Sequence, residues 1–165
     1  MGITKVYHGT SSHFSRIDLL KSRDRRDFGS GFYVTIIYEQ AEQWAQNIFL
    51  RRGGEKTIVK VYEYNDELSN LKKCIFNSMN KEWLEFIKDN RTKGGVPHDF
   101  DIVTGPVAND NTMRTIALYI SGIYTVDMTL KQLRFSRANN QISFHTEKAL
   151  AALSWKNDIE VPFNV

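Results

Sequence analysis

"TKVYHGTSSHF", Thr4 to Phe14, joins an alternating apolar segment to a histidine, a glycine and a threonine. The alternation over residues 3–8 predicts a short strand. Turns after strands usually use Asn-Gly or Pro-Asp, whose backbone preferences fit a tight bend. His8 and Gly9 instead offer a hydrogen-bonding ring beside a backbone without a side chain. The stretch therefore raises the question of a functional role at this strand end.

Length and composition predict a single domain, residues 1–165. With 165 residues, 41% hydrophobic and 25% charged, the chain resembles an average globular domain with one sizeable core. No apolar run approaches the roughly eighteen residues of a membrane span, and the start "MGITKVYHG" lacks a secretory-signal layout. The lone Cys74 has no Cys or His partner at metal-ligand spacing, so we expect it in the core. We expect a cytoplasmic chain that neither crosses a membrane nor binds a metal ion.

Strands and helices follow one another without a repeat or a linker. Apolar alternation and β-branched runs predict strands at residues 3–8, 31–36, 57–64, 71–76, 100–108 and 141–146. Apolar residues at helical spacing predict helices at residues 38–52, 80–91, 109–122, 129–135 and 147–155. Gly53 and Gly54 should stop the first helix, and Thr146 should cap the last. Because helices separate only some of the strands, we predict an α+β fold with a mixed sheet.

Three of these segments form an ordered set: "YHGT" at Tyr7–Thr10, "DFGSGFYVT" at Asp27–Thr35 followed by "QAEQWA", and "NNQISFHT" at Asn139–Thr146. Together they resemble the His-Tyr branch of the ADP-ribosyltransferase superfamily, which includes diphtheria-like toxins and poly-ADP-ribose polymerases. With "SRDRRDFGSGFYVT" and "DFDIVTGPVANDN" added, nearly the whole chain resembles a bacterial family of small domains of this type, of unknown function and often found in toxin contexts. The resemblance implies a split mixed β-sheet, two packed sheets with flanking helices.

The resemblance also implies NAD as a substrate and gives roles to individual residues. His8 would contact a ribose hydroxyl, the Gly9 backbone would hold the nicotinamide amide, and Tyr33 would stack on the nicotinamide ring. The remaining residues of the implied NAD site are Thr10, Arg23, Asp27 and Gly31. Each has a plainer alternative. An isolated His-Gly is more often a half-buried histidine bonded to a carbonyl, a strand tyrosine is more often core, and "KSRDRRDFG" is more often a solvated loop.

The third position of the motif departs from the common pattern. Most His-Tyr enzymes place a glutamate at the head of the late strand, and the matching residue here is Gln141. An amide keeps the hydrogen bonds of a carboxylate but removes its charge. This disfavours elongation of a poly-ADP-ribose chain and favours transfer of a single ADP-ribose unit. Glu147 is the alternative, although a glutamate in a first helical turn ordinarily stabilises the helix start.

The function implied is mono-ADP-ribosylation of a protein or nucleic acid with release of nicotinamide, in a bacterial toxin held in check by an antitoxin. An NAD glycohydrolase and an inactive module that binds NAD or ADP-ribose are the alternatives. The loop before Gln141 would contact the acceptor through Arg134, Ser136 and Arg137. Asn109, Asp110 and Asn111 are either helix-capping residues or part of the acceptor side. Nothing in the sequence identifies the acceptor.

Overall fold

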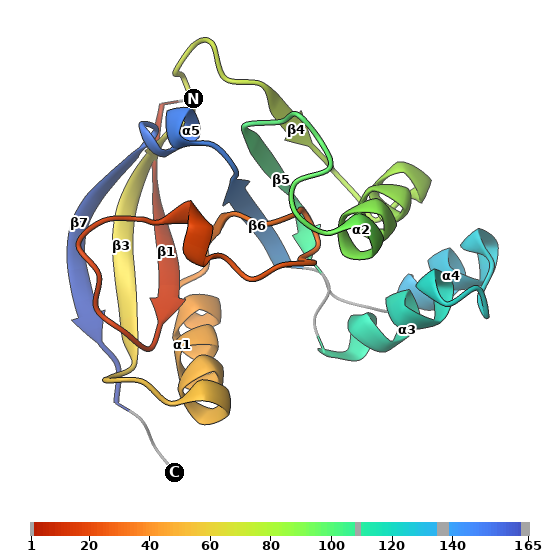
Figure 1. Ribbon diagram of the computed structural model, residues 1–165, viewed down its shortest axis with the longest axis horizontal. Helices are drawn as coiled ribbons and strands as arrows, with labels where there is room; N and C mark the ends of the chain where they lie inside the picture. Colours follow the sequence, from red (N-terminus) through yellow and green to blue (C-terminus); the bar gives the residue numbers. More distant parts are fainter. Residues whose placement is uncertain (1, 108–109, 135–138, 163–165) are drawn as a thin grey trace.

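The computed structural model describes residues 2–107, 110–134 and 139–162, which form an α+β fold around one mixed sheet (Figure 1). The strands are β1 (Ile3–Thr10), β2 (Phe32–Thr35), β3 (Ile58–Asn65), β4 (Lys73–Ile75), β5 (Ile102–Val107), β6 (Asn139–Phe144) and β7 (Leu153–Glu160). The helices are α1 (Tyr38–Arg52), α2 (Lys81–Lys93), α3 (Asp110–Ile120), α4 (Val126–Leu133) and α5 (Glu147–Leu150), with a 3₁₀ turn η1 (Leu19–Lys21).

The sheet has the strand order β4-β5-β6-β2-β1-β3-β7. We call the pairing of β1 with β2 the joint of the sheet, because it consists of one register pair. Among the described strand pairs, β4 with β5 is parallel and the others are antiparallel. The register of β1 with β3 runs from Ile3↔Asn65 to Thr10↔Ile58, whereas β1 and β2 share the single pair Tyr7↔Thr35. Figure 1 shows β1, β3 and β7 on one side of this joint and β4, β5 and β6 on the other.

Both faces of the sheet carry buried apolar side chains, because successive strand residues point to opposite faces. Phe32 and Tyr33 illustrate the alternation: both are buried, and they belong to different clusters. The cluster with Phe32 includes Val6, Val34, Tyr62 and Phe144, and the cluster with Tyr33 includes Trp83, Leu84, Ile87 and Val103. The described core therefore lies on both sides of the sheet.

Several predicted elements are confirmed. The helix at 38–52 has the expected bounds and ends at Gly53, whose φ of 71° is a left-handed value that suits glycine. The Thr146 hydroxyl accepts a hydrogen bond from the Ala149 amide, as expected of an N-cap. The α+β class and the mixed sheet are confirmed as well.

The described strands lie in one mixed hydrogen-bonded sheet, and the split-sheet form stays a prediction. Other predictions were wrong. The first strand continues past His8 to Thr10, because it pairs with β3 over that whole length. The helix expected over 147–155 ends at Leu150, and the chain then pairs with the free edge of β3 as β7. Cys74 is half-buried at the periphery of one cluster.

Gly9 allows α1 to pack directly on β1. A Cβ atom at this position would lie 2.0 Å from the Ala41 carbonyl oxygen and 2.8 Å from the Ala45 amide nitrogen. Both atoms belong to the helix backbone, so no side-chain rotation relieves the clash. The contact between β1 and α1 therefore requires glycine here, independently of any ligand.

We predict that Gly9→Ala lowers the free energy of unfolding by about 3 kcal/mol or more, at the upper end of overpacking effects. The reason is that α1 must shift away from β1. Chemical denaturation of the variant measures the loss, with Thr4→Ala as an exposed control on the same strand that should stay within about 0.5 kcal/mol of wild type. Equal stability of Gly9→Ala and wild type would contradict the packing role.

Candidate functional site

The three motif residues lie on strands that are neighbours in the sheet although they are far apart in the chain. The order β6-β2-β1 places Gln141, Tyr33 and His8 on consecutive strands. Thr35 links them in register, since it pairs with Gln141 on one side and with Tyr7 on the other. The residues therefore gather at the narrow joint between β1 and β2.

Their side chains do not all share one face of the sheet. Directly opposed residues of antiparallel strands point the same way, so Tyr33 and Gln141 share a face through their common neighbour Thr35. His8 lies on the opposite face, where its ring stacks on Phe32 with a centroid distance of 4.1 Å. The structure thus places Tyr33 and Gln141 on one face of the sheet. It connects His8 to Tyr33 through the backbone of β2.

His8 bridges the joint by a hydrogen bond to the backbone of β2. Its Nδ1 lies 2.7 Å from the Tyr33 carbonyl oxygen. Because a carbonyl only accepts, Nδ1 carries the proton and Nε2 keeps a lone pair. Burial, with smaller effects of Arg26 and Lys60, lowers the pKa of His8 to about 4, so the ring is neutral at pH 7. His8 therefore presents an acceptor nitrogen that suits a hydroxyl group.

Tyr33 is enclosed on every side and is only 2% exposed. Its hydroxyl donates to the Gly29 carbonyl at 2.6 Å and accepts from the Phe28 amide at 3.0 Å. The guanidinium carbon of Arg26 lies 3.8 Å from the centre of the ring. Burial raises the pKa of the Tyr33 hydroxyl, which stays protonated. In this conformation the ring contacts Arg26 rather than solvent.

Gln141 is only 6% exposed, and no hydrogen bond joins its amide to any described residue. Among the described residues, the fully buried side-chain atom without a partner is Asn90 Oδ1 and not an atom of Gln141, so the Gln141 amide keeps some contact with solvent. Gly105 lies opposite it on β5, where no side chain competes for the amide. Gln141 therefore has hydrogen-bonding capacity to offer a ligand. Glu147, the alternative residue, is exposed in the first turn of α5, where it stabilises the helix start.

The loop before β2 is clamped by side chains that bind its carbonyl oxygens. Gly29, with φ of 94°, provides the left-handed turn that this path needs. Three buried side chains and the half-buried His98 donate to consecutive carbonyls: Asn90 to Asp27 at 2.9 Å, His98 to Phe28 at 2.7 Å, Tyr33 to Gly29 at 2.6 Å and His145 to Ser30 at 2.8 Å. The sequence carried no periodic signal for this clamp.

Other predicted NAD-binding residues have structural partners. Arg91 donates to the buried Asp27 carboxylate from Nε at 2.8 Å and also from Nη2. The Thr10 hydroxyl contacts the backbone of Ser12. A Cβ atom at Gly31 would meet the Phe144 carbonyl at 2.6 Å. These contacts hold the loop and the strand ends together, so such residues shape the site whether or not they touch a ligand.

Arg23 is exposed, and partial burial together with Arg51 and Arg52 lowers its pKa. No ion pair joins Arg23 to a described acidic residue. Arg23 lies close to Arg51 and Arg52 in the last turn of α1, and the three form a basic group that suits an anion.

Among the predicted acceptor residues, Arg134 is exposed directly after α4, and Asp110 and Asn111 begin α3. Asn109, Ser136 and Arg137 lie outside the described residues. The predicted acceptor loop is therefore only partly placed.

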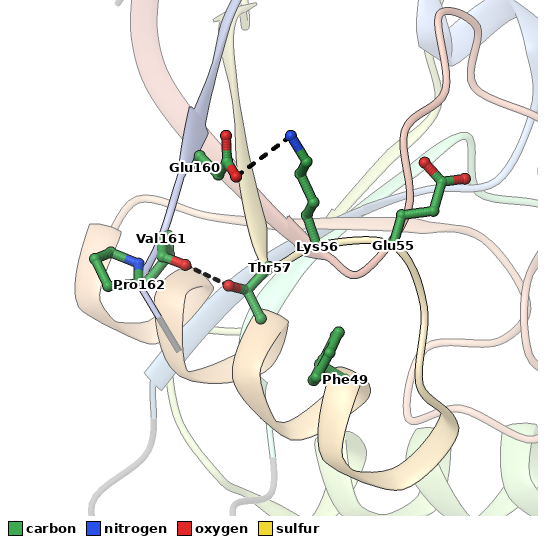
Figure 2. Close-up of a pocket in the computed structure, with 7 residues that line it drawn as sticks. All are labelled: Phe49, Glu55, Lys56, Thr57, Glu160, Val161 and Pro162. Carbon is green, nitrogen blue, oxygen red and sulfur yellow. Dashed lines mark hydrogen bonds and ion pairs between the residues drawn. The ribbon is translucent and has the colours of Figure 1, made fainter. Parts of the chain in front are cut away.

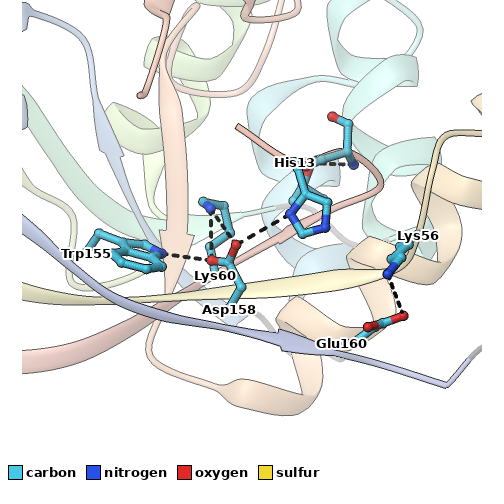
Figure 3. Close-up of polar contacts among 8 residues, drawn as sticks. His13, Lys56, Lys60, Trp155, Asp158 and Glu160 are labelled. Atoms are coloured by element: carbon cyan, nitrogen blue, oxygen red, sulfur yellow. Dashed lines mark hydrogen bonds and ion pairs between the residues drawn. The ribbon is translucent and has the colours of Figure 1, made fainter. Parts of the chain in front are cut away.

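Two further features lie away from Tyr33. An open pocket at the ends of α1, β3 and β7 is lined by Phe49, Thr57, Val161 and their neighbours, and by none of the predicted site residues (Figure 2). On the face of His8, the buried Lys60 lies opposite His8 in register and binds both carboxylate oxygens of Asp158, at 2.9 and 3.0 Å. Figure 3 shows His13 and Trp155 completing this polar cluster.

A family model matches residues 4–155, so the chain belongs to the DUF3990 family, which is described as proteins of unknown function. Neither the curated proteins nor the solved structures gave a match. No helix in the described part of the chain is long and apolar enough to cross a membrane. Within the same residues, no group of three or more His, Cys, Asp or Glu side chains is arranged to hold a metal ion.

We predict that His145 makes the fold sensitive to mild acid. Burial, helped by the nearby His98 and Arg26, lowers its pKa from 6.5 to about 4. The unfolded chain takes up this proton first, so stability is complete above pH 6.5 and is lost as the pH falls towards 4, by on the order of 3 kcal/mol.

Denaturation midpoints measured between pH 7 and pH 4 test this, with His145→Gln as the comparison. The variant removes the titrating ring but keeps a donor for Ser30. Its stability should fall less steeply with acid than that of wild type. Parallel curves for the two proteins would contradict the role of His145.

Proposed function

We propose that this chain is an NAD-dependent mono-ADP-ribosyltransferase that transfers ADP-ribose to a protein or nucleic acid and releases nicotinamide. The observation that carries the proposal is the convergence of His8, Tyr33 and Gln141 on adjacent strands at one joint of the sheet. The chain has more than ninety residues between Tyr33 and Gln141, so their convergence does not follow from spacing.

The architecture of the sheet supports the same proposal. The strands β3, β7 and β1 form one half, and β2, β6, β5 and β4 form the other, with Tyr7↔Thr35 as the register pair between β1 and β2. A sheet that parts at this point is what the split sheet of ADP-ribosyltransferases requires. We therefore assign the split-sheet form of the fold as part of the proposal.

The chemistry suits the groups present. The bond from ribose C1′ to the nicotinamide nitrogen breaks with its electron pair moving to the pyridinium, which leaves as neutral nicotinamide. An acceptor nucleophile bonds to C1′ and loses its proton. On one face of the sheet the neutral His8 ring can accept from a hydroxyl through Nε2, and on the other face, beside Tyr33, the Gln141 amide can hold a ribose hydroxyl. Tyr33 supplies an aromatic face for the cationic ring, worth about 0.5 to 2 kcal/mol.

The remaining parts of the proposal concern partners. We assign Arg23 to the phosphate side of NAD and the region around Arg134 to the acceptor, on the basis of charge and exposure. The resemblance to toxin-associated domains makes the chain a bacterial toxin with a cognate antitoxin, acting in the cytoplasm and without a metal. The amide at Gln141 favours transfer of a single ADP-ribose unit, since it brings no negative charge to the developing cation.

The proposal is tested by incubating the protein with NAD labelled in its ADP-ribose portion, with and without bacterial lysate. A transferase attaches label to a macromolecule, and digestion with protease or nuclease then gives the class of acceptor. Label that appears only as free ADP-ribose would identify an NAD glycohydrolase. No loss of NAD in either sample would leave a binding module and overturn the enzymatic proposal.

We predict that Gln141→Ala slows nicotinamide release by about 10²–10³-fold, as the loss of one oriented transition-state partner typically does. Gln141→Glu should keep or raise the rate of NAD hydrolysis, because a carboxylate near the forming cation adds attraction. Initial rates of nicotinamide release at one pH compare the three proteins, with thermal melts to confirm folding. An unchanged rate in Gln141→Ala would move the third catalytic position to Glu147.

We predict that expression of the wild-type chain alone slows bacterial growth and that His8→Ala relieves the effect. The substitution removes both the acceptor nitrogen and the bond to the Tyr33 carbonyl. Growth curves at matched soluble protein levels give the comparison, and Lys21→Ala, an exposed change, serves as the control that should stay toxic. Equal growth of wild type and His8→Ala cultures would count against a toxin.

A further inference from the structure

We propose that Arg26 closes the ligand-free site by occupying the ring of Tyr33, so that a planar cationic ligand ring must displace it. This inference rests on the proposed function, because it concerns how NAD reaches Tyr33. Arg26 lies in "SRDRRDFGS", directly before the clamped loop. The resemblance to ADP-ribosyltransferases gives this residue no role.

The contact is direct. The guanidinium carbon lies 3.8 Å from the Tyr33 ring centre, and the ring is 2% exposed. Guanidinium and pyridinium are both flat, delocalised cations, and both are attracted to the negative face of an aromatic ring. The side chain of Arg26 therefore satisfies the same surface that nicotinamide would use, and the two cannot occupy it together.

Only the side chain of Arg26 needs to move. Its backbone carbonyl accepts from the Gly29 amide at 3.1 Å, and the next residue, Asp27, is bound by Arg91 and Asn90. The guanidinium itself has neither a hydrogen bond nor an ion pair to any described residue, and the Tyr33 ring is its recorded partner. It can thus leave the ring by rotation while the clamped loop stays in place.

The charges around Arg26 indicate what accompanies its release. Burial lowers the pKa of Arg26, Tyr33 and Asp27 oppose this effect, and the nearby Arg23 and Arg52 lower the pKa a little further. When the Arg26 guanidinium leaves the ring, it stays near the positive charges of Arg23 and Arg52. The repulsion between these charges is relieved when an anion binds among them. A ligand that carries both a pyridinium and a diphosphate supplies the displacing cation and the anion together. Arg26 therefore favours the whole dinucleotide over the isolated ring.

Two binding measurements test this, each made on the 165-residue chain as wild type, as Arg26→Ala and as Lys21→Ala. Lys21→Ala removes one positive charge from the same loop at an exposed position. Arg26→Ala should bind 1-methylnicotinamide roughly fivefold to tenfold more tightly than wild type, in keeping with the strength of a cation–π contact. The gain for NAD should be smaller, because the variant also lacks a partner for the diphosphate. Lys21→Ala should match wild type for the methylated ring.

A third measurement needs no ligand. In the NMR spectrum of the free protein, the side-chain protons of Arg26 should be shifted upfield by the Tyr33 ring, and added NAD should remove the shift. Absence of the shift in the free protein would overturn the inference, and so would equal ring affinity in wild type and Arg26→Ala while both bind NAD. An equal gain in Lys21→Ala would reduce the effect to net charge and overturn it too. If neither wild type nor Arg26→Ala binds NAD, the proposed function fails and the inference fails with it.

Discussion

The hydrogen bond from His8 Nδ1 to the Tyr33 carbonyl joins β1 to β2 in the middle of the sheet, where these two strands share one register pair. The register pair of β1 and β2 is Tyr7↔Thr35. Beyond that pair, the side chain of His8 forms the hydrogen bond between the two strands. The same bond fixes which ring nitrogen carries the proton. One contact therefore joins two neighbouring strands and also leaves Nε2 of the same ring as an acceptor.

The position of Tyr33 depends in turn on the clamped loop. The Tyr33 hydroxyl is one of the donors that bind the loop, so the ring is oriented by the segment that it helps to hold. His98 and His145 act as neutral donors in the same clamp, and each has an acceptor role for its second nitrogen, towards the Phe100 amide and the Ser143 hydroxyl respectively. Fully used rings of this kind favour structure over catalysis, which distinguishes them from His8.

The sequence predicted the elements whose patterns are local and could not predict contacts made across the fold. Spacing of apolar residues located α1 and β3, and Gly53 marked the helix end. The helical spacing of "EKALAALSW" predicts a helix that runs into the first three residues of β7, whereas the strand pairing of β7 depends on the free edge of β3 and leaves no signal in the sequence. For the same reason Gly9 was assigned to a ligand alone: the approach of the Ala41 carbonyl is a tertiary contact with no signature in the chain. The placement of Arg26 on Tyr33 is likewise visible only in three dimensions.

The clamp has a consequence for the order in which the molecule is assembled. Its bonds join residues 63 positions apart for Asn90 and Asp27, 70 for His98 and Phe28, and 115 for His145 and Ser30. Contacts between such distant parts of a chain form slowly, because the entropy of closing each loop is lost before the contact gains anything. During synthesis the last of these bonds must wait until His145, which directly follows β6, has been made. The surroundings of Tyr33 are thus completed only after residue 145 has left the ribosome and β6 has paired with β2.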